Sequence, residues 1–205
     1  AAALMVSAST SSSAADESGD YGRLAGDLLL SADVGAAAAL GQDVHGGAIH
    51  GRVALLYLST AGISFEYQDG FDNDAQTLRR ALAGGVEMRP LFLGRFARDL
   101  TRGPAYADLL IDSLSLGLGM HHTWHRVCPP APSPCPGRDF GMTTWLGIAM
   151  PLLPRMNTPF VSLRAAARWS LAPEDYGPQA LLTLSLGYQH VVATGLVDAG
   201  DALTW

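Results

Sequence analysis

Lysine is absent from this chain of 205 residues, and all 13 basic residues are arginines. Charged residues make up only 16% of the sequence, the formal net charge is −6, and no arginine-rich stretch is present. Binding to nucleic-acid phosphates needs clustered positive charge, so the composition argues against a nucleic-acid partner. Apolar residues amount to 48%, which is enough to form a folded domain.

Long apolar runs are also missing. No uninterrupted stretch reaches the ~18 residues that a membrane-spanning helix requires. Turn-rich segments divide the chain at short intervals, and no helix of useful length is expected between them. The pattern therefore favours strands throughout.

Cysteine occurs only twice, at Cys128 and Cys135 in the proline-rich stretch "CPPAPSPC". This arrangement suits a disulfide formed in an oxidising compartment, and two reduced surface thiols are the alternative. A zinc site would need further ligands at the right spacing, so no metal or other cofactor is predicted.

The first 20 residues read like the end of a secretory signal. Small residues at 13–15 precede the acidic Asp16, as at a signal cleavage site. A plain disordered Ala/Ser tail is the alternative. In either case residues 1–20 are left out of the fold, and 22–205 are expected to form one domain.

Apolar residues alternate with small polar residues along much of the chain. In "LTLSLGYQH", Leu182, Leu184 and Leu186 alternate with Thr183 and Ser185. The same pattern covers 110–124, where one parity holds the apolar residues Leu114, Leu116 and Leu118. A period of two over many residues predicts β-strands.

Further alternating segments lie near 28–36, 51–67, 79–96, 140–152 and 161–171. Residues 51–67 form either one long strand or a hairpin that turns at Ser59–Gly62. With the hairpin there are eight strands, and the tight turns "STAG" and "PRMN" fall on one side, opposite the long cysteine loop. The predicted fold is all-β, an antiparallel up-and-down barrel of eight strands.

The polar parity of these strands consists mainly of Gly, Ser, Ala and Thr, which fit a narrow barrel interior. A water-facing sheet is usually richer in charged residues. We therefore expect the apolar parity to face lipid. The residues expected there are Leu114, Leu116, Leu118, Leu182, Leu184 and Leu186. The alternatives are a soluble periplasmic barrel that binds a small apolar ligand inside, and a β-sandwich.

Residues 22–205 resemble the small outer-membrane β-barrel proteins of Gram-negative bacteria. The resemblance rests on the signal-like start, the alternating strands, the short turns opposite longer loops, and the final aromatic Trp205. Leu203 fits the alternating apolar positions common at the end of such barrels, whereas Asp201 departs from them. The resemblance implies a transmembrane barrel with lipid and the barrel-assembly machinery as partners. Its role would be structural or surface recognition.

The alternation also directs charged residues into the barrel. The residues on the inward parity are Asp33, Glu66, Glu87, Arg89, Arg164 and Arg168. An eight-stranded barrel has room for side chains but not for an open channel, and buried charges must pair. An ion-pair network that fills the lumen is expected, with a binding or gated polar path as the alternative.

Other candidate sites are weaker. His121 and His125 of "HHTWH" would lie about 13 Å apart along one strand face, too far apart to share a metal. The acidic stretch 69–74 lacks the ligand order of a calcium-binding loop. Ser113 and Ser115 have no motif that supplies a base, so a lipid-modifying enzyme is not expected. Loop 126–138 is the predicted surface for an external partner.

Overall fold

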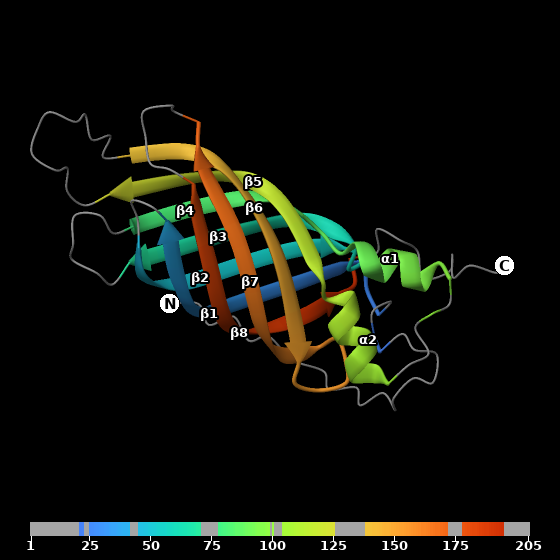
Figure 1. Ribbon diagram of the computed structural model, residues 1–205. Helices are drawn as coiled ribbons and strands as arrows, with labels where there is room; N and C mark the ends of the chain where they lie inside the picture. Colours follow the sequence, from blue (N-terminus) through green and yellow to red (C-terminus); the bar gives the residue numbers. More distant parts are fainter. Residues whose placement is uncertain are drawn as a thin grey trace, which may run out of the picture.

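The eight predicted strands are present and close into a barrel (Figure 1). The computed structural model describes residues 21–22, 25–41, 45–70, 78–98, 100, 104–125, 138–171 and 178–194. Each strand pairs antiparallel with the next, and the last pairs with the first. The strands are β1 (Leu28–Gly41), β2 (His45–Tyr57), β3 (Ala61–Gly70), β4 (Leu78–Met88), β5 (Ser115–His125), β6 (Arg138–Pro151), β7 (Thr158–Ser170) and β8 (Gln179–Val192).

The hairpin is the correct interpretation of residues 51–67. β2 and β3 are joined by a tight turn in which Leu58 and Ser59 have φ angles of 45° and 57°. The amide of Thr60 donates to the Tyr57 carbonyl at 2.9 Å. β2 begins at His45, six residues before the expected start of the alternating segment at 51, so the strand has 13 residues.

Two helices between β4 and β5 contradict the expectation that the chain has none. They are α1 (Pro90–Phe96) and α2 (Ala105–Asp112). Pro90 stands in the first turn of α1, where its missing N–H costs no hydrogen bond, whereas in a strand it could not donate to the ladder. Leu110 therefore lies in α2, and Leu114 precedes β5 instead of lying within it. Neither helix is long and apolar enough to cross a membrane.

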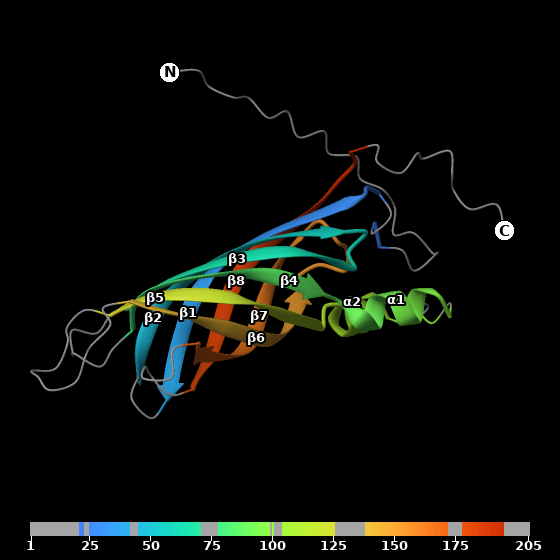
Figure 2. The same ribbon diagram turned by 90° about the horizontal axis from the view of Figure 1, so that it is seen from above.

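Both helices lie at one end of the barrel (Figure 2). The start of β1 and the end of β8 are at the same end, where the Asp27 amide donates to the Val192 carbonyl at 3.1 Å. The connections after β2 and β6 also turn there. β1, β3, β5 and β7 end at the opposite end of the barrel.

Several predictions concern residues outside the described part of the chain. These are the signal-like segment 1–20, the cysteine pair Cys128 and Cys135, and the terminal Trp205. The signal and the disulfide therefore stay predictions.

Side-chain burial alternates along the strands with the charged and polar side chains inside. On β8, Thr183 and Ser185 are buried, whereas Leu182, Leu184 and Leu186 are about half exposed. Leu116 and Leu118 on β5 are likewise exposed. The wall thus turns its apolar side outward, which is the reverse of a water-soluble barrel.

Closure of the barrel depends on a close approach at Gly35 of β1. A Cβ atom at this position would lie 2.0 Å from the Leu184 carbonyl oxygen of β8. We expect Gly35→Ala to weaken β1–β8 pairing and to reduce the fraction of folded barrel. Heat-dependent mobility in gel electrophoresis measures that fraction.

The matched control is Gly51→Ala, where an added Cβ meets nothing within 4 Å. This variant should fold as well as the parent chain. Equal folding of the two variants would show that the close approach at Gly35 does not limit closure.

Candidate functional site

The charged side chains that the alternation directs inward are all buried. The buried set comprises Asp33, Glu66, Glu87, Arg89, Arg164 and Arg168. They come from β1, β3, β4, β7 and the residue after β4. Because the barrel is closed, these strands hold the side chains within reach of one another.

Arg52 on β2 bridges two of the carboxylates. Its Nη1 donates to Asp33 Oδ2 at 2.9 Å, and its Nη2 donates to both Glu87 carboxylate oxygens at 2.7 Å. The side chain of Arg52 is only 9% exposed. A guanidinium that donates to two carboxylates is a strong, geometrically defined contact.

Glu66 on β3 accepts from arginines on the far side of the barrel. Arg164 Nη1 lies 3.1 Å from Glu66 Oε2, and Arg168 Nη2 donates to Glu66 Oε1 at 2.9 Å. Arg168 also donates to Gln68 Oε1 at 3.0 Å, and Gln68 donates to Glu66 at 2.7 Å. These bonds cross the interior and tie β7 to β3.

His50 lies between the two groups of ion pairs. Its Nε2 is 3.4 Å from Asp33 Oδ1, and its Nδ1 is 3.7 Å from Glu66 Oε1. Ser185 donates to Asp33 at 2.8 Å, and the hydroxyls of Ser162 and Ser185 are 2.6 Å apart. We call Asp33, His50, Arg52, Glu66, Gln68, Glu87, Arg164 and Arg168 the interior cluster.

Aromatic rings fill space beside the interior cluster. Trp145 of β6 points inward, and the Arg164 guanidinium lies 4.4 Å from its ring centroid, a cation–π contact. Phe160 is buried too. A cavity of about 20 Å³ beside the interior cluster is about large enough for one water molecule.

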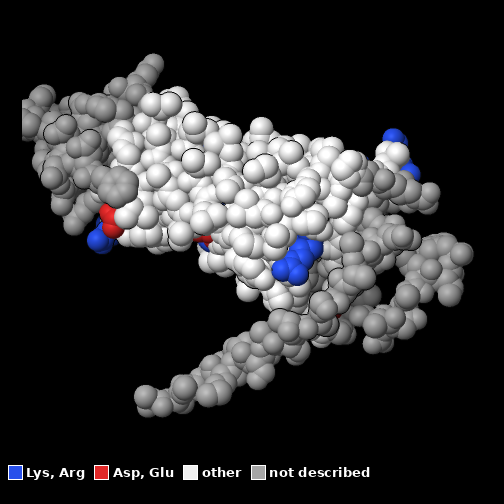
Figure 3. Space-filling view, turned by 90° about the horizontal axis from the view of Figure 1, so that it is seen from below, with Lys and Arg blue, Asp and Glu red and all other residues white. Residues whose placement is uncertain are grey.

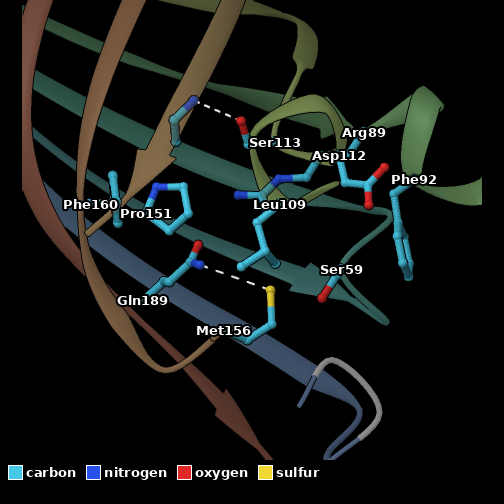
Figure 4. Close-up of a pocket in the computed structure, with 11 residues that line it drawn as sticks. Ser59, Arg89, Phe92, Leu109, Asp112, Ser113, Pro151, Met156, Phe160 and Gln189 are labelled. Carbon is cyan, nitrogen blue, oxygen red and sulfur yellow. Dashed lines mark hydrogen bonds between the residues drawn. The ribbon is translucent and has the colours of Figure 1, made fainter. Parts of the chain in front are cut away.

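Side chains of both helices, Leu109 of α2 and Phe92 of α1, line the cavity at the adjacent mouth of the barrel (Figure 4). Leu109 of α2 is buried in an apolar group with Leu29, Leu56, Met156 and Val191. The cavity that remains there, lined among others by Arg89, Phe92 and Asp112, is about 20 Å³. Gln189 Nε2 lies 3.9 Å from the Met156 sulfur at its inner side.

Ion pairs hold the two helices together at this mouth. Arg95 of α1 pairs with Asp108 and, at 3.2 Å, with Asp112, both on the buried face of α2. Tyr21 also donates to Asp108 at 3.1 Å. The charged face of α2 therefore turns toward α1 and Tyr21, and its aspartates are buried.

Arg52, His50 and Gln68 were not among the residues predicted to lie inside the barrel. The signal was present, because Arg52 shares its parity with the buried Ala54, and Gln68 shares its parity with Glu66. His50 was missed because it precedes residue 51, where the alternating segment was expected to begin. The helical ion pairs were missed with the helices, although Asp108 and Asp112 have the i, i+4 spacing of one helix face.

The remaining candidate residues do not come together in a common site. His121 is buried with its Nδ1 3.1 Å from the Met142 carbonyl, and His122 makes an edge-to-face contact with Trp124. Asp69 pairs with Arg80 at 3.4 Å at the barrel rim. Ser113 Oγ accepts from the Ala149 amide at 2.8 Å and donates to the Leu110 carbonyl. Within the described residues no group of His, Cys, Asp or Glu could hold a metal ion.

The outer wall carries almost no charge. Figure 3 shows one face, on which few red or blue atoms interrupt the barrel surface. Among exposed strand residues whose side chains are described, only Arg80 and Arg138 are formally charged, and both lie at the end away from the helices. An apolar band thus surrounds the barrel.

Comparison with known proteins gives a likeness of fold alone. No family model matches the chain, and no curated protein matches it. The solved structures with a similar fold include three that are 11% identical to this chain. Ail, the attachment invasion locus protein of Yersinia pestis, covers 80% of this chain and 99% of its own, with a TM-score of 0.45. The N-terminal β-barrel domain of Pseudomonas aeruginosa OprF covers 79% and 97%, with a TM-score of 0.46. Neisserial surface protein A covers 80% and 97%, with a TM-score of 0.45.

Removing one carboxylate should show how much the interior cluster contributes to the stability of the fold. Glu66→Gln leaves Arg164 and Arg168 buried without their common anion, and breaking a buried pair in this way costs about 3–5 kcal/mol. We expect a matching fall in the free energy of unfolding, measured by urea titration of the barrel in lipid vesicles with tryptophan fluorescence as the signal.

The control is Asp69→Asn, which removes the half-exposed pair with Arg80 and should cost less than about 1 kcal/mol. A loss of equal size in both variants would mean that the buried ion pairs contribute no more than a surface pair.

Proposed function

We propose that this protein is a transmembrane β-barrel of the bacterial outer membrane. The observation that carries the proposal is the apolar band around a closed barrel whose charged side chains lie inside. A closed barrel satisfies every strand's backbone hydrogen bonds internally, which hydrocarbon surroundings require. An even number of antiparallel strands with an outward apolar band is the common design of such barrels.

The orientation follows from the connections. Outer-membrane barrels place short turns on the periplasmic side and longer loops outside. The turns after β2 and β6 therefore mark the periplasmic end, and the helices lie there too. Loop 126–138 and the other connections of the opposite end then face outward. We propose that the protein is structural or presents these loops for surface recognition, and that the barrel-assembly machinery inserts it.

The interior supports a filled barrel rather than a pore or an enzyme. The interior cluster, Trp145 and Phe160 occupy the lumen, and α2 closes the periplasmic mouth. Ser113 and Ser115, the serines considered for catalysis, have no base aligned with them in the described contacts. We propose that the interior cluster is a structural network.

The soluble alternative predicts the opposite burial. A periplasmic barrel with an apolar ligand inside would bury Leu182, Leu184 and Leu186 and expose Arg164 and Arg168. The three leucines are instead exposed and the two arginines buried. The membrane proposal accounts for this placement and the soluble one does not.

Leu184 on β8 offers a direct test of the lipid-facing wall. Its side chain is 58% exposed near the middle of the strand. Leu184→Arg should prevent membrane assembly, because a lipid-facing arginine at the bilayer centre costs about 2–4 kcal/mol. The measurement is the heat-shifted fraction in isolated outer membranes. Leu184→Ala, which stays apolar, should assemble normally, and normal assembly of the arginine variant would contradict the proposal.

A filled lumen should block ion flow. We expect the reconstituted protein to show no steady conductance in a planar bilayer. Replacing both large interior rings, by Trp145→Ala with Phe160→Ala, should raise conductance while the ion pairs stay intact. Conductance in the parent chain equal to that of the double variant would show an open path and overturn the filled-lumen proposal.

A further inference from the structure

The segment that joins β4 to β5 has an unusual distribution of polar and apolar side chains. In α2 the charged Asp108 and Asp112 are buried with Leu109, whereas Tyr106 and Ile111 are 51% and 42% exposed. In α1 Leu91 and Leu93 are exposed, and Leu93 reaches 58%. A helix at a water-exposed mouth would normally turn its charges outward and its leucines inward.

Exposed charge is rare among the described residues of this segment. Their charged members are Arg89, Arg95, Arg98, Asp108 and Asp112, and Arg89 is buried. Arg95 is engaged with the two aspartates at the mouth. Of these charged side chains only that of Arg98 is exposed. The other exposed side chains are almost all apolar, so the segment repeats the polarity of the strands, with charge inside and apolar surface outside.

The apolar face of α2 continues the outer wall of the barrel. Only Ser113 and Leu114 separate α2 from β5. Ser113 Oγ accepts a hydrogen bond from the Ala149 amide of β6, so the end of α2 occupies the place where β5 would otherwise pair. The Tyr106 hydroxyl reaches the Leu152 carbonyl just beyond β6 at 3.4 Å. Leu152 and Met150 are both exposed on the wall.

We propose that the outer face of the α1–α2 segment contacts the lipid of the periplasmic leaflet. The inference rests on the proposed membrane location. It adds one point. Next to β5 and β6, the wall of the barrel continues beyond the strands as a helix that lies at the membrane interface. Apolar side chains joined to the lipid-facing band, with no exposed charge on α2 itself, fit a lipid surface. Tyrosine at such a boundary places its ring in the apolar region and its hydroxyl toward polar groups.

Spin labels on the full-length barrel in phospholipid vesicles can test this. Single cysteines carry the label at Ile111, at Tyr106 as a second site, at Leu184 as the lipid reference, and at Arg98 as the water reference. The native Cys128 and Cys135 are replaced by serine in each variant, and heat-dependent mobility confirms that each one folds. The readout is collision with oxygen, which partitions into lipid, relative to a nickel chelate, which stays in water.

The expected result is a ratio of oxygen to nickel accessibility at Ile111 and Tyr106 several-fold above that at Arg98 and close to that at Leu184. If Leu184 is lipid-exposed but Ile111 and Tyr106 resemble Arg98, the helical proposal is wrong and the membrane barrel stands. If Leu184 is itself water-accessible, the membrane proposal fails. Shielding of Ile111 from both reagents with spin–spin broadening would assign the face to a second copy of the chain and overturn the lipid contact.

Discussion

The interior cluster places three arginines and three carboxylates inside the closed barrel, and each of these arginines has a carboxylate oxygen within 3.1 Å. The apolar band leaves these charges no solvated outer face. Their pairing with one another therefore offsets the free-energy cost of burying them. Arg52 joins β1, β2 and β4, while Arg164 and Arg168 join β7 to β3. Strands far apart around the wall are thereby fixed relative to one another through the lumen.

The same constraint orders the helical mouth. Arg95 pairs with Asp108 and Asp112, just as Arg52 pairs with Asp33 and Glu87. In both groups the charges are turned inward. Leu109 adds apolar contacts with the ends of the strands. Along the whole length of the molecule, the surfaces that face the surroundings are apolar and the polar groups meet inside.

Much of this was predictable from the sequence, because strand alternation has a strict period of two. Leu184 and Arg164 could be assigned to opposite faces without coordinates, and the parity of loops favoured eight strands. The helices were not predicted because apolar residues such as Phe92 and Leu110 fit an alternating pattern as well as a helical one over a short stretch. The sequence also could not predict which residues of the interior cluster pair with one another. Arg168 and Glu66, for example, are 102 positions apart and meet only when the barrel closes.

The pairing of β1 with β8 has a consequence for how the molecule can form. This ladder joins residues 28–41 to residues 179–192, two segments far apart in the chain. Until it forms, β1 and β8 are open edges whose amides and carbonyls lack partners, and hydrocarbon offers them none. In the proposed membrane location we therefore expect closure of the barrel and entry into lipid to accompany each other. Such long-range pairing is intrinsically slow.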